Sequence, residues 1–393
     1  KSVYLSPTVF SPSARKKPVL FLGNMKKIAS ISMVKDECDI IELFVRINLR
    51  FVDRMYIIDN NSSDATVEII EKLQSEECPV TLWHDDSVDF QQSLTTISAV
   101  RRIADEYGPD WIIPLDADEF ITENGRDLRS ELENIPEKNC GLMEWRTFVP
   151  LTCDYATLEN PLWQNFRQRA IETVLVDKVV IPAHLAQQTL LPMGNHFLMT
   201  LEHKNVPSCK LSATLAHVPV RSPEQIVTKS IIGSIKHRIT WDRKADEGFH
   251  KDLLADFIRK CRDSPDTGEL QEMAFSYSQK PGEPVIRETD ADKRVGTIDD
   301  CIRYKELSVI NTLERFDRYM IELSSELHTN NSRNRITKSS AHEIERLKTI
   351  LDEKEKELRF FKRTALGKGI ARIVTMLNHH KKSRKYQAGP IDR

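Results

Sequence analysis

From Ile28 onward, short apolar runs alternate along the chain with amphipathic segments. Each run has the length of a strand, and each segment repeats its apolar residues with the period of a helix. This alternation is typical of a mainly parallel sheet flanked by helices, an α/β fold, because each crossover helix packs back on the sheet. The predicted strands are residues 28–33, 55–59, 80–84 and 111–116, with further strands at 141–146 and 173–182.

Three helices are predicted between the first four strands, and a fourth begins near Ser222. Ser222 can cap that helix, Pro223 suits its first position, and Gln225 completes a capping box. The predicted inward faces are Ile40, Ile41, Phe44 and Val45; Val67, Ile70 and Leu73; Ile97, Val100, Ile103 and Tyr107; and Val227, Ile231 and Ile235.

Composition and charge narrow the class of protein. The chain has 393 residues, 40% hydrophobic and 30% charged, with a net charge of −2, which is typical of a soluble globular protein and does not favour nucleic acid as a partner. Its seven cysteines are scattered and never spaced as Cys-x-x-Cys, which favours a reducing compartment. No apolar run reaches the roughly eighteen residues of a membrane span. We expect a cytoplasmic protein.

The chain divides into four predicted parts. Residues 1–24 are interpreted as an extension or an expression remnant, because Met25-Lys26-Lys27-Ile28 resembles a bacterial translation start. Residues 25–260 form the main domain, and 261–336 a linker with irregular and helical stretches. Residues 337–393 form a charged helical tail whose basic and apolar residues suit peripheral contact with the inner membrane face. The alternative is a solvated helix packed on the main domain or on a partner. A homo-oligomer is a further expectation.

Three carboxylates follow the fourth predicted strand, in the order Asp116-Ala117-Asp118-Glu119. Side chains alternate along a strand, so Asp116 and Asp118 should point the same way. Two such carboxylates repel each other, and they are hard-oxygen ligands for Mg²⁺ or Mn²⁺, which commonly bridge to substrate phosphates. The alternative is a solvated acidic turn.

Polar side chains also gather after the other strands, at residues 35–37, 59–64 and 84–86. Ligands of parallel sheets bind outside the carboxyl ends of the strands, so these segments should share one cleft. The glycine patterns of dinucleotide-binding and P-loop proteins are missing from the sequence. A phosphatase of the Asp-x-Asp type would carry its motif after the first strand, whereas here it follows the fourth.

The motifs and their order resemble the family 2-like glycosyltransferases with the GT-A fold, over roughly residues 25–238. The resemblance rests on Met33-Val34-Lys35-Asp36-Glu37, Ile58-Asp59-Asn60-Asn61-Ser62-Ser63-Asp64, Asp110 to Phe120, Glu144-Trp145-Arg146-Thr147-Phe148, Asp177-Lys178-Val179-Val180, Gly194-Asn195-His196 and His217 to Gln225. It implies a GT-A-like fold with a helical C-terminal extension. It also implies metal-dependent, inverting transfer of a sugar from a nucleotide diphosphate, UDP above all. The implied acceptor is a saccharide or lipid-linked saccharide of the cell envelope or a surface polysaccharide.

The resemblance also implies roles for individual residues. Asp116, Asp118 and His196 would hold Mn²⁺ or Mg²⁺, with Asp116 also facing the donor. Asp59 and Asp64 can accept hydrogen bonds from a base or ribose, although Asp64 can instead cap a helix. The remaining donor-binding candidates are Lys35, Glu37, Lys178, His217 and Arg221.

The base that takes the acceptor proton is predicted as Glu119 or Glu144. Each has an alternative: Glu119 can fix the loop, and Glu144 can be an exposed strand residue. Between residues 147 and 169 the sequence lacks the glycine-bearing loop that the resemblance implies and reads Phe148-Val149-Pro150-Leu151-Thr152-Cys153 instead. Two other functions stay open, a non-catalytic nucleotide-binding scaffold acting through its C-terminal helix and a metal-dependent nucleotidyltransferase.

Overall fold

The structure is a computed structural model of the chain. It describes residues 26–85, 92–170, 176–239, 249–261, 264–277, 287–289, 295–333, 346, 348–354 and 356. The predicted N-terminal extension lies outside these residues, and so does the basic part of the tail beyond residue 356.

One half of the main sheet is parallel. Strands β1 and β4 pair in parallel, as do β1 and β2 and also β2 and β3, in the order β3-β2-β1-β4. These strands carry apolar side chains toward both faces, as a sheet covered by helices on both sides requires. Their bounds are Ile28–Val34 for β1, Arg54–Asp59 for β2, Val80–His84 for β3 and Trp111–Pro114 for β4.

The other half of the sheet is mixed. Strand β8 is antiparallel to β4, β6 is antiparallel to β8, and β7 and β12 continue the sheet beyond β6. Strand β11 pairs in parallel with β6 and antiparallel with β5, which brings His217 opposite Glu119 and Thr147. The bounds are Glu119–Thr122 (β5), Cys140–Val149 (β6), Gln168–Ala170 (β7), Asp177–Pro182 (β8), Ser208–His217 (β11) and Arg287–Thr289 (β12), with Thr189–Leu190 (β9) and Met199–Thr200 (β10) forming a separate hairpin.

Helices cover both faces of the parallel half. Helices α1 and α2 pack on one face, where Phe44 and Ile70 join Ile57 in the largest core cluster. Helix α3 packs on the other, where Val100 meets Ile58. The helices are Ile41–Asn48 (α1), Thr66–Ser75 (α2), Gln92–Glu106 (α3), Leu128–Glu133 (α4), Pro161–Asn165 (α5), Pro223–Ile239 (α6), Phe249–Lys260 (α7), Thr267–Ser276 (α8) and Thr312–Arg333 (α9), with 3₁₀ turns at Tyr155–Thr157, Ala183–Gln188 and Met193–Asn195. The predicted α/β class, a sheet flanked by helices, is confirmed. The sheet is mixed, however, and only β1 to β4 form the parallel half that the pattern predicted.

Two details differ from the predicted pattern. In α2, Ile69 is fully buried, whereas Val67 is only partly buried. The Gln225 side chain does not close a capping box, because its Oε1 accepts from the backbone N–H of Arg221, 3.1 Å away, and not from Ser222. Ser222 does cap α6, since its Oγ accepts from the Gln225 N–H at 3.2 Å.

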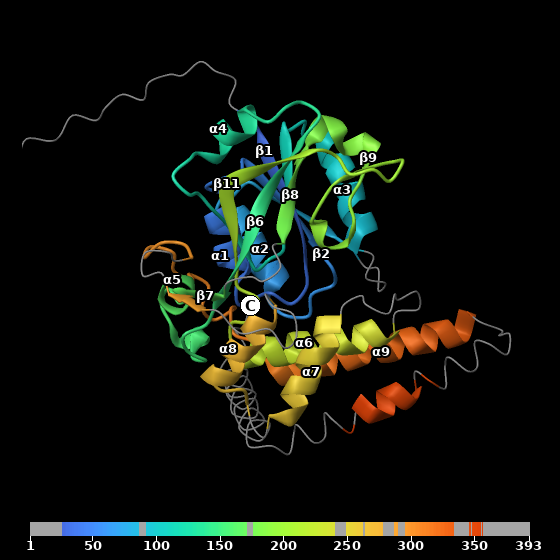
Figure 1. The fold of residues 1–393 in the computed structure, drawn as a ribbon. Helices are drawn as coiled ribbons and strands as arrows, with labels where there is room; N and C mark the ends of the chain where they lie inside the picture. The colour runs from blue at the N-terminus through green and yellow to red at the C-terminus, as the bar shows by residue number, and fades with distance from the viewer. Residues whose placement is uncertain are drawn as a thin grey trace, which may run out of the picture.

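The region predicted as a linker takes part in the core. Val295 is buried in the largest cluster, and Tyr304 and Leu307 pack against the same cluster. Helix α9 lies beside α6 (Figure 1), where Phe316 contacts the apolar face that contains Val227. The segment from 295 to 333 is therefore built onto the main domain.

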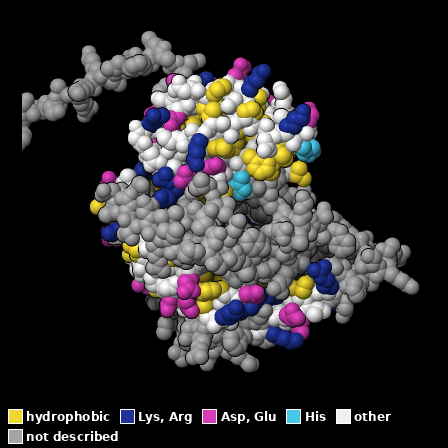
Figure 2. Space-filling model, viewed as in Figure 1, with side chains coloured by type: hydrophobic (Ala, Val, Ile, Leu, Met, Phe, Trp, Pro, Cys, Tyr) yellow, Lys and Arg dark blue, Asp and Glu magenta, His cyan; other side chains and the backbone are white. Residues whose placement is uncertain are grey.

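The described surface carries mixed charge. On the face drawn in Figure 2, acidic and basic side chains are interspersed over the described residues. Among the helices described, none is long and apolar enough to cross a membrane.

Candidate active site

The acidic turn after β4 is tied down by its own third carboxylate. Glu119 Oε2 accepts from the backbone N–H of Asp116 at 2.9 Å, and the Glu119 N–H donates to the Asp116 carbonyl oxygen at 3.0 Å. Asn48 on α1 holds the following strand, donating to the Glu119 carbonyl at 3.0 Å and accepting from the Ile121 N–H at 2.9 Å. Glu119 is fully buried, so its carboxylate shapes the turn from within.

Lys178, on β8, neutralises one side of the turn. Its Nζ lies 2.6 Å from Asp116 Oδ2 and 3.0 Å from Glu119 Oε1, and its side chain is 1% exposed. Burial alone would lower the pKa of Lys178, but the two carboxylates outweigh burial and raise it well above its usual range. Burial raises the pKa of Glu119 to about 8 against the opposing pull of Lys178. Lys178 is thus shared between the partly exposed Asp116 and the buried Glu119.

Asp118 faces a different pair of groups. Lys229 Nζ, from α6, lies 2.7 Å from Asp118 Oδ2, and His217 Nε2, at the end of β11, lies 3.8 Å from Asp118 Oδ1. Burial would raise the pKa of Asp118, yet the positive charges of Lys229 and Arg221 hold it below its usual range. Asp118 is therefore a carboxylate at neutral pH.

His217 is held neutral against an aromatic ring. Burial lowers its pKa to about 3 despite the nearby carboxylate of Asp118. Its ring stacks on Trp145, with centroids 4.0 Å apart and planes inclined by 30°. A neutral imidazole is a suitable metal ligand.

Arg221 belongs to a buried network at the end of β1. Its Nε lies 2.6 Å from Asp39 Oδ2, and its Nη2 lies 2.6 Å from Glu37 Oε2. Burial would lower the pKa of Arg221, but these carboxylates raise it further above its usual range. Both predicted residues, Glu37 and Arg221, thus meet close to the acidic turn, and Lys229 Nζ reaches to 3.9 Å from Glu37 Oε1.

The candidates at the end of β2 form a second group. Asp59 is buried, accepts from the backbone N–H of Ser62 at 3.1 Å, and lies 3.9 Å from His84 Nδ1. Asp64 accepts from the Thr66 N–H at 2.9 Å at the start of α2, and it also pairs with Arg315 of α9. Its predicted alternative role as a helix cap fits this contact.

Lys35 is also engaged by α9. Its Nζ donates to the Asn61 carbonyl at 2.9 Å and lies 3.4 Å from Glu322 Oε2. Arg315 and Glu322 therefore bring α9 against the loops that follow β1 and β2.

Two predicted residues lie apart from this cluster. His196 Nδ1 is 3.0 Å from the Asp177 carbonyl, and its ring centroid is 6.2 Å from that of Trp145. Gly194 has φ +82°, and a Cβ there would lie 2.4 Å from His196 Nε2, so a glycine lets the ring pack closely. Glu144 pairs with Lys210 at 3.1 Å; it precedes Trp145 on β6, and neighbouring side chains point to opposite faces.

Several residues that build the site were not predicted. They are Asp39, Asn48, Trp145, Lys229 and Arg315. Lys229 had a detectable signal, because it follows the predicted cap Ser222 by seven residues and so lies two turns along the same helix face. Arg315 had none, since the pattern does not tell which loop a distant helix covers.

The residues around the acidic turn offer two ligands for a divalent ion. Within the described ranges, no group of three His, Cys, Asp or Glu side chains is arranged to hold one. Asp118 Oδ1 and the neutral His217 Nε2, 3.8 Å apart, could still occupy two positions of one coordination shell. His217, predicted as a donor-binding residue, thus lies beside Asp118, whereas the predicted metal ligand His196 contacts the Asp177 carbonyl.

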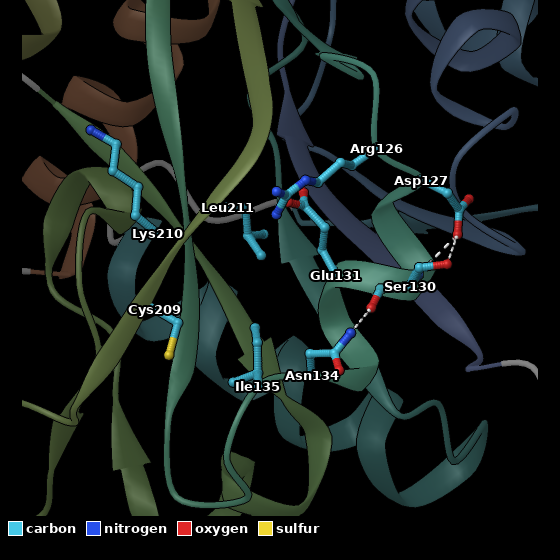
Figure 3. A pocket seen from close by; sticks show the side chains of 9 residues that line it. All are labelled: Arg126, Asp127, Ser130, Glu131, Asn134, Ile135, Cys209, Lys210 and Leu211. Atoms are coloured by element: carbon cyan, nitrogen blue, oxygen red, sulfur yellow. Dashed lines mark hydrogen bonds between the residues drawn. The ribbon is translucent and has the colours of Figure 1, made fainter.

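A separate depression opens near the start of β11 (Figure 3). It has a volume of about 500 Å³ and is lined by Arg126, Asp127, Ser130, Glu131, Asn134, Ile135, Cys209, Lys210 and Leu211. Seven residues of β11 separate Lys210 from His217, a distance of roughly 20 Å along a strand. This depression is therefore distinct from the acidic turn.

No family model matches the chain. Two curated proteins, an uncharacterized protein of Mycobacterium bovis and one of Mycobacterium tuberculosis, are each 27% identical to it over 132 residues. The match covers 29% of this chain and 31% of each relative, so it spans about a third of their length.

The chain is similar to solved glycosyltransferase structures, at low identity. A mannosyltransferase from Pyrobaculum calidifontis, in complex with GDP-Man and Mn²⁺, is 12% identical with a TM-score of 0.32, covering 64% of this chain and 69% of that one. GalNAc-T7 with UDP, GalNAc and Mn²⁺ is 10% identical with a TM-score of 0.31, covering 59% and 54%. Glucosyl-3-phosphoglycerate synthase from Mycobacterium tuberculosis is 16% identical with a TM-score of 0.22, covering 31% and 44%. Because these scores are low, the functional argument rests on the site itself.

Proposed function

We propose that this chain is a glycosyltransferase that moves a sugar from a nucleotide diphosphate donor to a saccharide acceptor, with inversion. One observation carries the proposal: the acidic pair Asp116 and Asp118 follows β4 and meets two lysines and a neutral histidine from β8, α6 and β11. The carboxylates can bind a divalent cation, and the neighbouring ammonium groups can bind phosphate. Together they suit a diphosphate and its counter-ion.

The ion would be held by Asp118 and His217, with Asp116 beside them and His196 as a further candidate. A divalent ion bound there would neutralise the charge that develops on the departing nucleoside diphosphate. The chain's own contribution is to hold the two carboxylates: Glu119 and Lys178 position Asp116, and Trp145 positions the His217 ring.

The loop after β2 is the proposed place of the base and ribose. Asp59 is buried at the end of β2 and keeps acceptor capacity beyond its contact with Ser62, since a carboxylate offers about four lone-pair sites. Lys35 and Asp64 border the same loop, and both are steadied by α9 through Glu322 and Arg315. A UDP-sugar is the donor we propose.

Glu119 and Glu144 are the two predicted candidates for the base that takes the acceptor proton. Glu119 is fully buried and already receives an N–H and an ammonium, so we propose it as a positioning residue. Glu144 is partly exposed and pairs with Lys210 and Arg146. It remains the candidate base if the acceptor approaches that face of β6. A cell-envelope or surface polysaccharide is the acceptor class that we propose.

The test is a screen of nucleotide sugars by thermal shift and by donor hydrolysis, each with Mn²⁺, with Mg²⁺ and with chelator. We expect one nucleotide class to raise the melting temperature and to release nucleoside diphosphate. Release of pyrophosphate would favour a nucleotidyltransferase instead. Binding without any turnover, across donors and acceptors, would favour a scaffold, and absence of any nucleotide effect would contradict the proposal.

A further inference from the structure

Lys229 lies beside the position that a divalent ion on Asp118 would take. Its ammonium lies 2.7 Å from Asp118 Oδ2 and 3.9 Å from Glu37 Oε1, so it bridges the turn after β4 and the loop after β1. An ion held by the other oxygen of Asp118 and by His217 Nε2 would sit beside this ammonium. Like charges so close repel strongly in a buried setting.

The two lysines of the turn differ in their freedom to move. Lys178 is 1% exposed and lies between Asp116 and the fully buried Glu119, so leaving them would separate a buried ammonium from its partners. The Lys229 side chain is 37% exposed and is carried on a flexible four-carbon stem. Lys229 can therefore leave Asp118 toward solvent or toward an anion in the cleft, whereas Lys178 cannot.

We propose that Lys229 is an internal counter-ion that competes with the divalent ion for Asp118 and, once displaced, binds the donor diphosphate. The inference rests on the proposed function for its second half only. Without an ion, Lys229 neutralises Asp118 and links the turn after β4 to the loop after β1. When an ion takes Asp118, the ammonium turns to the phosphates, so ion and donor bind cooperatively.

The test uses the full-length chain with Lys229→Met and, as a matched control, Lys210→Met. Lys210 is a half-exposed lysine that pairs with Glu144 and Asp177, away from the turn. Isothermal titration with Mn²⁺ alone should show tighter binding to Lys229→Met by roughly ten- to a hundredfold, the equivalent of one charged hydrogen bond. Titration with nucleoside diphosphate at saturating Mn²⁺ should show weaker binding to the same variant. Lys210→Met should match the wild type in both.

Opposite signs in the two titrations are the signature, because a merely structural lysine would weaken both. Circular dichroism checks that the variant is folded, and Lys229→Gln, which keeps a polar end without charge, should repeat the result. Unchanged or weaker Mn²⁺ binding in both variants overturns the competition, as does undetectable Mn²⁺ binding in all proteins. If Mn²⁺ binding tightens but no protein binds any nucleotide, the competition stands and the proposed function fails.

Discussion

The two aspartates of the acidic turn are two residues apart, yet they have different surroundings. Asp116 faces Lys178, a buried lysine shared with Glu119, whereas Asp118 faces the partly exposed Lys229 and the neutral His217. The same chemical charge is thus neutralised once by a fixed internal partner and once by an exchangeable one. A site can in this way keep one carboxylate in place for structure and leave the other available to a ligand.

The largest effect on stability is expected for Lys178, the buried lysine beside Asp116. Lys178→Met should lower the free energy of unfolding by about 3 kcal/mol, because it removes the ammonium from the fully buried Glu119 and from Asp116, whose 35% exposure lets water offset part of the loss. Urea denaturation measures this. The control Lys210→Met, with a half-exposed ion pair, should cost about 1 kcal/mol or less. Similar small losses for both variants would show that Lys178 contributes no more to stability than a half-exposed ion pair.

Asp118→Asn should abolish sugar transfer, because the proposed ion loses a carboxylate ligand. It should also lower the free energy of unfolding by about 1–3 kcal/mol, since Lys229 loses a charged hydrogen bond. Repulsion between the aspartates alone predicts the opposite, a more stable variant. Turnover assays and urea denaturation on the same preparation decide between them. Full activity with unaltered Mn²⁺ dependence would contradict the role of Asp118.

Asp59 tests whether the donor extends beyond the turn to the end of β2. Asp59→Ala should weaken nucleoside diphosphate binding by about 1–3 kcal/mol if a buried hydrogen bond to the base or ribose is lost. Calorimetry measures the affinity. An unchanged affinity with a large loss of stability would mean that Asp59 only holds the Ser62 backbone.

Glu119, the third carboxyl group of the turn, should change the pH dependence of stability. Burial raises the pKa of Glu119 from 4.5 to about 8, so its stabilising contribution is complete below the unfolded value and is lost as pH rises through about 8. Glu119→Gln should remove this loss, making stability flatter between about pH 5 and about pH 9. Urea denaturation at both pH values tests it. An equally steep decline in the variant would assign the dependence to other groups.

The parallel half of the fold could be predicted because its determinants are local. The apolar runs that became β1 to β4 and the faces of α1 and α3 follow directly from periodicity, and the cap at Ser222 follows from three residues. The role of residues 295–333 was not predictable in the same way. The irregular pattern of residues 261–336 indicates a linker with helical stretches, but only three-dimensional contacts reveal that Val295 fills the main core.

By itself, the sequence determined that two carboxylates follow a buried strand and that cationic residues occur further along the chain. Only the tertiary structure decided which cation meets which carboxylate. Lys178 reaches Asp116 across 62 residues, and Lys229 reaches Asp118 across 111. Strand and helix periodicity acts over a few residues, whereas ion pairing in a buried site depends on which elements the whole core brings together, and no local pattern encodes that.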